Sequence, residues 1–344
     1  ITGSHNPANY NGFKMVFQGR PFFGADILKL CVEVGGCLTG EHGVGIEKRD
    51  LMPCQLSDDD LDLQEELKRA FDPGLLLNPG KVYPTLRTCA EGVLKQTDYP
   101  DFELIVADND SGEPETLAYM DEIASDPRVR IVRWPHPFNY SAINNFAARH
   151  ARGEFLCLLN NDIEVIEPDW LFAMMREAVR PGVGAVGARL LYPDRTIQHA
   201  GVAIGIGNAA GHAHRGLEPG EPGYFAQALI TRGASAVTAA CLLVAKKNFD
   251  AVGGLDEEHL AVAYNDVDLC LKLQAAGLRN IYTPAATLIH HESKSRGLDF
   301  APEHLERYLG ELKAFQERWD TMSVIDPWHH SQLDRSNEVF GRSS

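Results

Sequence analysis

The sequence lacks the cysteine spacing that zinc sites and redox-active thiols use. It has seven cysteines, an odd number, and no two of them form a C-x-x-C pair. Zinc and redox motifs depend on such pairs, and a secreted disulfide framework depends on an even set of partners. We therefore expect inert, reduced thiols in the core of a cytoplasmic protein.

Basic residues and long apolar runs are also scarce. The 32 lysines and arginines are outnumbered by 48 aspartates and glutamates, which gives a formal net charge of -16. This balance argues against nucleic acid as a partner, because binding its phosphates depends on basic patches. The longest apolar stretch, Ala234 to Ala245, is too short and too rich in alanine to span a bilayer, and no signal peptide is recognisable. We expect a cytoplasmic chain, with peripheral association at the inner face of the membrane as the alternative.

What the sequence does contain is a group of oxygen-bearing side chains at the end of an apolar run. Asn160-Asn161-Asp162 directly follows Phe155 to Leu159, and a second cluster, Asn265-Asp266-Val267-Asp268, lies further along the chain. Open α/β sheets bind ligands at strand ends, and a carboxylate there can hold a divalent cation that in turn binds a diphosphate. An ordinary turn is the competing interpretation of the tripeptide, since Asn and Asp both tolerate turn conformations.

The apolar segments follow one another in a pattern typical of layered α/β domains. The expected strands are Phe102 to Ala107, Val129 to Val132, Phe155 to Leu159, Val183 to Leu191 and Val237 to Val244, and the expected helices lie near Thr116 to Ala124, Ser141 to His150 and Trp170 to Val179. Strands that alternate with helices predict a mainly parallel, Rossmann-like sheet flanked by helices.

From about Leu86 to the end, the sequence resembles the family-2 glycosyltransferases of GT-A fold. The matching motifs, in order, are Gln96-Thr97-Asp98-Tyr99-Pro100, Phe102 to Ser111, Phe138 to Asn145, Leu158 to Val165, Gly187 to Asp194, Ile197 to Gly201, Gly253 to Glu257, Asn265 to Leu269 and His290 to Ser293. The resemblance implies an inverting transferase that moves a sugar from a nucleotide-sugar donor to a saccharide or lipid-linked acceptor. It also implies dependence on Mg²⁺ or Mn²⁺ and a place in polysaccharide or cell-envelope glycan synthesis.

The same resemblance assigns roles to individual residues. Asp108, Asn144 and Asn160 are expected at the donor site, with Asn160 standing where relatives have the first acid of an Asp-x-Asp motif. Asp162 is expected to coordinate the metal while the donor diphosphate completes the coordination shell. Asp266 is expected to be the general base that deprotonates the acceptor hydroxyl.

Three further residues are candidates for the same site. Asp268 begins the same expected helix as Asp266, and an acid in a first turn can also serve only to cap amides and favour the helix dipole. His290 and His291 follow an apolar strand, where relatives place a histidine near the diphosphate or metal. Alternation along a strand points one histidine inward and the other outward, and we expect His291, ahead of His290, to be the metal ligand.

The first part of the chain resembles two other families. Residues 1–26 resemble the active-site loop of the phosphomannomutase/phosphoglucomutase family, in which Ser4 would be the phosphorylated serine. Residues 28–84 resemble the C-terminal end of glycolate-oxidase-type FAD-linked oxidases, in which His42 would lie beside the flavin. Neither segment carries the rest of its family's active site, so we expect an irregular extension without flavin or mutase chemistry.

We therefore expect a fragment or composite chain of four segments: a mutase-like fragment at 1–27, an oxidase-like fragment at 28–85, a glycosyltransferase domain at 86–325 and a tail at 326–344. One feature argues against turnover. The family begins with a strand that forms the floor of the nucleotide site. Here only the end of that strand has a counterpart, Val82-Tyr83-Pro84-Thr85. Loss of that strand would leave its neighbour with an unpaired edge. A catalytically inactive composite or binding domain is thus the alternative function, followed by an FAD-linked oxidase or phosphohexomutase.

Overall fold

The computed structural model describes residues 15–17, 20–22, 86–291, 302–336, 338 and 340. The chain divides into two compact units, Ile1–Tyr83 and Pro84–Ser344. In the first unit the described elements are two short strands, β1 (Met15–Phe17) and β2 (Arg20–Phe22), which pair antiparallel. Ser4 and His42 lie outside the described residues.

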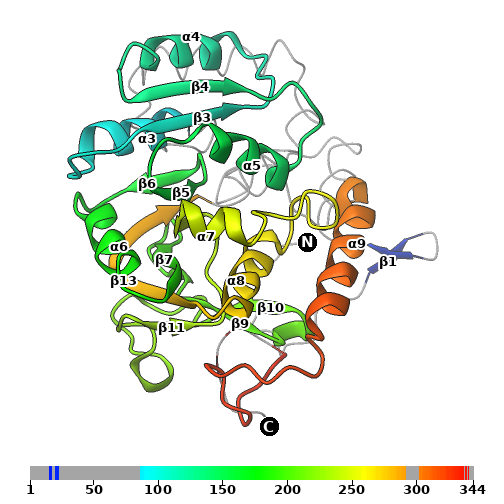
Figure 1. The fold of residues 1–344 in the computed structure, drawn as a ribbon. Helices are drawn as coiled ribbons and strands as arrows, with labels where there is room; N and C mark the ends of the chain where they lie inside the picture. Colours follow the sequence, from blue (N-terminus) through cyan, green and yellow to red (C-terminus); the bar gives the residue numbers. More distant parts are fainter. Residues whose placement is uncertain are drawn as a thin grey trace. The chain divides into compact units, whose positions relative to one another are not determined.

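The second unit is an α/β structure, which confirms the expected fold class (Figure 1). Its helical elements are α3 (Leu86–Glu91), the π-helical turn η2 (Gly92–Gln96), α4 (Pro114–Ile123), α5 (Tyr140–His150), α6 (Trp170–Ala178), η3 (Ile206–Asn208), η4 (Tyr224–Ala226), α7 (Lys246–Ala251), α8 (Asn265–Ala275) and α9 (Pro302–Trp319). Its strands are β3 (Leu104–Asp108), β4 (Val129–Arg133), β5 (Phe155–Leu159), β6 (Ile163–Val165), β7 (Val183–Leu191), β8 (Ile197–His199), β9 (Val202–Ile204), β10 (Ala210–His212), β11 (Arg232–Ala234), β12 (Cys241–Ala245) and β13 (Arg279–His290).

The main sheet is mixed, so the expectation of a mainly parallel sheet is wrong. Its strand order is β11-β13-β7-β12-β5, with β6 paired to β13 and β8 paired to β7. Of these pairs, β13 with β7 is parallel, whereas β12 runs antiparallel to both β5 and β7. An apolar run predicts a buried strand but carries no information about strand direction, which is why the sequence pattern did not reveal this.

The sheet separates two hydrophobic cores. Along β12, Leu242 and Val244 face the core to which α8 contributes, while Cys241 and Leu243 face the core to which α6 contributes. Successive side chains of a strand point to opposite faces, so a strand covered by helices on both sides must be apolar throughout. The last five residues of the apolar stretch rejected as a membrane span form this central strand. None of the described helices combines the length and apolar character needed to cross a bilayer.

Strands β3 and β4 form a separate parallel pair. In the described part of the chain, β3 pairs with β4 alone, β5 pairs with β12 alone, and no strand lies between β3 and β5. Each of these two strands therefore has one edge without a ladder partner among the described residues. This is the arrangement expected if the first strand of the family is missing.

Two asparagines, one before α5 and one in its middle, fix this helix against a distant loop. Asn139 caps the helix by accepting from the Ala142 amide, and its side-chain amide donates to the Glu257 carbonyl. Asn145 exchanges two hydrogen bonds with the Leu255 backbone and also donates to the Glu257 carboxylate. These bonds hold Tyr140, the first residue of the helix, in a defined position.

The C-terminal segment packs on the rest of the unit. Asp326 accepts from the Ile204 amide at 2.6 Å, and the buried residues Leu333 and Phe340 join a small core with Ala203 and residues around η3. Residues after α9 thus cover the β9–β10 pair.

Gly187 in β7 marks a close approach that only glycine permits. A Cβ at this position would lie 2.4 Å from the Cβ of the fully buried Val237. We predict that Gly187→Ala lowers the free energy of unfolding by about 1–3 kcal/mol through overpacking. Gly310→Ala, on the exposed face of α9 where a Cβ meets open space, should instead raise it by about 0.5–1 kcal/mol. Urea denaturation of both variants checks this, and a shift of the same sign in both would contradict the packing described.

Candidate active site

The ends of β5 and β13 bring Asp162 and His290 together. His290 pairs with Ile163 across the β13–β6 ladder, and its Nε2 lies 3.0 Å from Asp162 Oδ1. Both side chains are buried, with 7% of Asp162 and 8% of His290 exposed. The contact joins the two strand ends that the sequence motifs marked.

Asp162 is held in its charged form. Burial alone raises the pKa of this carboxyl, but the hydrogen bond and the charge of His290, with a contribution from His291, outweigh burial and lower the pKa below its usual value. A buried carboxylate that stays ionised is suited to receive a cation.

The pair fits a divalent cation that has further ligands. His290 Nδ1 lies 2.7 Å from Gln198 Oε1, an acceptor that favours a proton on Nδ1. A cation bound here would take the place of the Nε2 proton that bonds Asp162, and it would meet the Nε2 lone pair. A proton on Nδ1 gives the tautomer that a metal-binding histidine needs, and a second residue bonded to the other nitrogen is the usual way to fix it. The described residues contain no group of three His, Cys, Asp or Glu side chains that could hold a metal, so two protein ligands would have to be completed by a diphosphate and water.

Asp266 lies in the first turn of α8 and is held by backbone amides. Its Oδ2 accepts from the Ala239 amide at 2.9 Å, and its Oδ1 accepts from the Val267 amide at 2.8 Å. Each oxygen retains a further lone pair that can accept a proton. The two amides therefore orient the carboxylate, and its oxygens can still accept a hydrogen bond or a proton.

Tyr140 connects the two halves of the site. Its hydroxyl lies 3.2 Å from Asn160 Oδ1 and 3.2 Å from the Ala239 carbonyl oxygen. The Asn160 amide nitrogen in turn lies 3.3 Å from His290 Nε2. A continuous series of contacts thus runs from Asp266 through Ala239, Tyr140 and Asn160 to the Asp162–His290 pair.

The Glycosyl transferase family 2 model matches residues 80–221. The chain contains a family 2 glycosyltransferase domain. A second model, FAD linked oxidases, C-terminal domain, matches residues 20–82, which begins before the expected boundary at residue 28. Both matches agree with the resemblances seen in the sequence.

Two curated relatives align with the glycosyltransferase part of the chain. The sequence is 51% identical over 261 residues to y4gI, an uncharacterized protein of Sinorhizobium fredii (strain NBRC 101917 / NGR234). It is 46% identical over 244 residues to the O-antigen biosynthesis protein RfbC of Myxococcus xanthus. These alignments cover 75% and 71% of this chain but 29% and 18% of the relatives, so the chain spans less than a third of either protein.

A solved structure shares the fold. The crystal structure of GalNAc-T7 with UDP, GalNAc and Mn²⁺ matches with a TM-score of 0.53 at 14% sequence identity, covering 67% of this chain and 45% of that one. At this identity the likeness shows the GT-A-like fold of the glycosyltransferase domain and leaves its ligands to be argued from the residues.

The adjacent histidines His290 and His291 differ in orientation. His291 donates its backbone amide to the Asp162 carbonyl at 3.0 Å, while its ring Nε2 lies 2.8 Å from Glu164 Oε2. His290, and not the expected His291, is thus the ring that contacts the Asp162 carboxylate. Strand alternation predicted that the two histidine rings would point to opposite sides. Which of them faces Asp162 depends on the register of β13 against β6.

Two expected donor-site residues make local contacts instead of joining this series. Asp108, 3% exposed at the end of β3, accepts from the Ser111 amide at 3.0 Å and lies 3.8 Å from Arg133. Asn144 donates to the Tyr140 carbonyl one turn earlier in α5. Their donor-binding roles stay predictions.

Sequence reasoning missed Tyr140, Gln198 and His199. All three lie inside motifs that carried the family resemblance. A polar side chain within an otherwise apolar element was the sequence feature that could have identified them. His199 is fully buried and its Nδ1 lies 2.9 Å from His212 Nδ1. Burial, followed by the charges of His212 and other neighbours, lowers its pKa well below the usual value, so the ring is neutral and can accept from the Thr238 amide at 3.5 Å. It thereby supports the loop that contains Ala239.

Asp268 makes structural contacts away from this series. Its Oδ1 accepts from Arg318 and from the Trp319 indole, each at 2.9 Å, and its Oδ2 lies 3.1 Å from Lys272 Nζ. The carboxylate is fully buried and joins α8 to the end of α9. These contacts favour the structural alternative that the sequence left open for one of the two helix acids.

We predict that Asp268→Asn lowers the free energy of unfolding by about 1–3 kcal/mol, because it leaves two cations beside a buried neutral group. Asp250→Asn is the matched control, since Asp250 also pairs with a lysine four residues away but is 56% exposed. That variant should change stability by less than about 0.5 kcal/mol. Chemical denaturation monitored by circular dichroism measures both, and equal losses would show that the α8–α9 contact contributes little.

Proposed function

We propose that this chain transfers a sugar from a nucleotide-sugar donor to a hydroxyl of a saccharide or lipid-linked acceptor, with inversion at the anomeric carbon. The observation that carries the proposal is the series of contacts that joins Asp162 and His290 to Asp266. It supports the proposal because an Asp–His pair suited to a cation and a hydrogen-bonded carboxylate lie in one region, although the two parts are far apart in the sequence.

The two ends of this series have different chemical tasks. Asp162 and His290 would hold Mg²⁺ or Mn²⁺ together with the donor diphosphate, and the cation would offset the negative charge of the departing nucleotide diphosphate. Asp266 accepts the proton of the acceptor hydroxyl as that oxygen bonds to the anomeric carbon and the bond to the diphosphate breaks. The amides of Ala239 and Val267 keep the carboxylate in position for this proton transfer.

Other residues would orient the donor. Asn160 can donate to a ribose or sugar hydroxyl with the second N–H of its amide, and Asp108 ends β3 at the edge where open α/β sheets bind nucleotides. Asn144 is assigned here by its motif alone. The 46% identity to a protein named for O-antigen biosynthesis supports a place in polysaccharide synthesis. The acidic balance of the chain supports a partner other than nucleic acid.

One observation favours a second candidate, a binding domain without turnover. No described strand lies between β3 and β5, and in this fold class the nucleotide lies across strand ends. Such a domain would bind nucleotide but leave the donor intact. Incubation with UDP-, GDP- and dTDP-sugars in Mn²⁺, followed by quantification of free nucleotide, separates the two functions.

We predict that Asp162→Asn and Asp266→Asn fail at different stages. Asp162→Asn should weaken nucleotide binding in Mn²⁺ at least tenfold, with no such loss relative to the parent in EDTA, because the carboxylate acts on the ground-state metal complex. Asp266→Asn should keep nucleotide affinity within about twofold and lower turnover by about 10²- to 10⁴-fold, because a base acts only as the proton moves.

Calorimetry of nucleotide binding and a sugar-transfer assay on the full chain measure both effects. Asp121→Asn, an exposed aspartate on α4, serves as the control for loss of one negative charge. If both site variants lost nucleotide affinity to the same extent, Asp266 would be a binding or structural residue and the base assignment would be wrong.

A further inference from the structure

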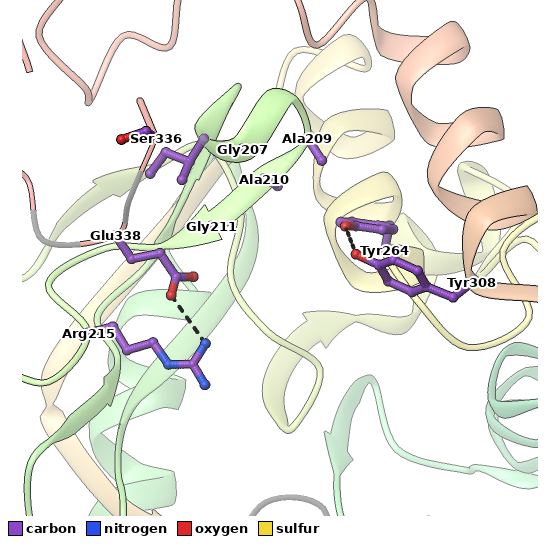
Figure 2. A pocket seen from close by; sticks show the side chains of 10 residues that line it. Gly207, Ala209, Ala210, Gly211, Arg215, Tyr264, Tyr308, Ser336 and Glu338 are labelled. Carbon is purple, nitrogen blue, oxygen red and sulfur yellow. Dashed lines mark hydrogen bonds and ion pairs between the residues drawn. The ribbon is translucent and has the colours of Figure 1, made fainter. Parts of the chain in front are cut away.

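A pocket of about 520 Å³ lies between the β9–β10 region, α8, α9 and the C-terminal segment (Figure 2). Its size falls within the range of small-molecule sites, about 300–1,000 Å³. Nothing in the site described above uses it. Its lining nevertheless includes Tyr264, the residue directly before the helix whose first turn contains Asp266.

Two polar pairs form opposite walls of this pocket. On one side the hydroxyls of Tyr264 and Tyr308 lie 2.8 Å apart, and on the other Arg215 Nη1 lies 3.2 Å from Glu338 Oε2. Figure 2 shows the Arg215–Glu338 pair and the Tyr264–Tyr308 pair on opposite sides of the view. The walls therefore present hydroxyl, guanidinium and carboxylate groups with no net charge.

Each wall is fixed by contacts behind it. The Tyr264 ring stacks on Phe315 with ring centres 4.9 Å apart and planes 10° from parallel. Glu338 Oε1 accepts from the His212 amide at 2.6 Å, and Arg215 donates to the Tyr192 hydroxyl. Polar groups held in this way lose little freedom when a ligand binds, which favours affinity.

The floor of the pocket is made of small residues. Gly207, Ala209, Ala210 and Gly211 line it, and at Gly211 an added Cβ would lie 3.0 Å from Glu338 Cγ and 2.7 Å from Ile206 Cγ2. Small side chains there keep the volume open and allow Glu338 to approach the strand. A larger side chain at Ala210, which lines the pocket and is half-buried, would fill it.

We propose that this pocket binds the saccharide acceptor and that Tyr308, Arg215 and Glu338 determine which sugar is accepted. The inference rests on the proposed function. An uncharged polyol matches walls that pair donors with acceptors and carry no net charge. Among the described residues that line the pocket, a nucleotide diphosphate would find one cation, Arg215, already paired with Glu338. Tyr264, which lines the pocket, directly precedes α8, and the first turn of that helix contains Asp266.

The first test is binding of methyl glycosides of glucose, galactose, mannose and N-acetylglucosamine to the full chain, measured by saturation-transfer NMR. At least one glycoside should bind, and Ala210→Leu should weaken that binding at least tenfold by filling the pocket. Ala118→Leu, on the exposed face of α4, controls for the added apolar surface. If none of the glycosides bound, or if Ala210→Leu bound them as the parent does, the inference would be overturned, whatever the donor chemistry.

The second test uses the glycoside that binds best as acceptor. Tyr308→Phe should raise its KM about threefold to tenfold, the effect of one lost hydrogen bond, and raise it more than the KM of the donor. Tyr99→Phe, a tyrosine that packs near Phe172 in the other core, is the matched control. A parallel rise of both KM values would instead assign Tyr308 to donor binding or folding and overturn the proposal.

These two tests separate this inference from the proposed function. Glycoside binding that depends on Ala210, without release of nucleotide from any donor, would support saccharide binding in the pocket and contradict sugar transfer. Nucleotide release without glycoside binding would support the donor chemistry and contradict saccharide binding in the pocket. Circular dichroism of each variant checks that it folds, and Tyr308→Phe remains informative if Ala210→Leu does not fold.

Discussion

The peptide groups of Ala239 are the point on which the site depends. The amide of this residue holds Asp266, and its carbonyl oxygen accepts from Tyr140, which also contacts Asn160. Backbone groups have no side-chain rotamers, so Asp266 and Tyr140 are both positioned by the main chain of the same residue. The loop that contains Ala239 leads directly into β12, a strand buried on both faces. The precision of the site thus comes from the best-packed part of the sheet.

Packing around this loop uses small side chains at defined places. Val237 fits against Gly187 of β7 so closely that a methyl group has no room, and the Thr238 amide is supported by the neutral ring of His199. On the other side of α8, Asp268 joins the helix to Arg318 and Trp319. The helix that contains Asp266 is therefore fixed in its first turn by the loop and, through Asp268, by the end of α9.

The sequence predicted the elements better than their arrangement. The expected strand Phe155 to Leu159 and the strand Val183 to Leu191 match β5 and β7, because long apolar runs are strong local signals. The antiparallel direction of β12 and the choice between His290 and His291 were not predictable, since both depend on pairing with distant strands. Tyr140 was not predicted either, because its role arises only when α5 is placed beside the ends of β5 and β12. Motifs therefore located the site, and tertiary contacts decided which atoms meet.

The distance along the chain between the paired residues has a consequence for the order of assembly. Asn160 and His290 are 130 residues apart in the sequence, and Asn145 and Leu255, which fix α5, are 110 residues apart. Closing such long loops is slow, so contacts of this kind form late in folding. During synthesis, β5 and its neighbours leave the ribosome well before β13. The growing chain therefore acquires the apolar strand β5 before His290 is available to contact Asp162.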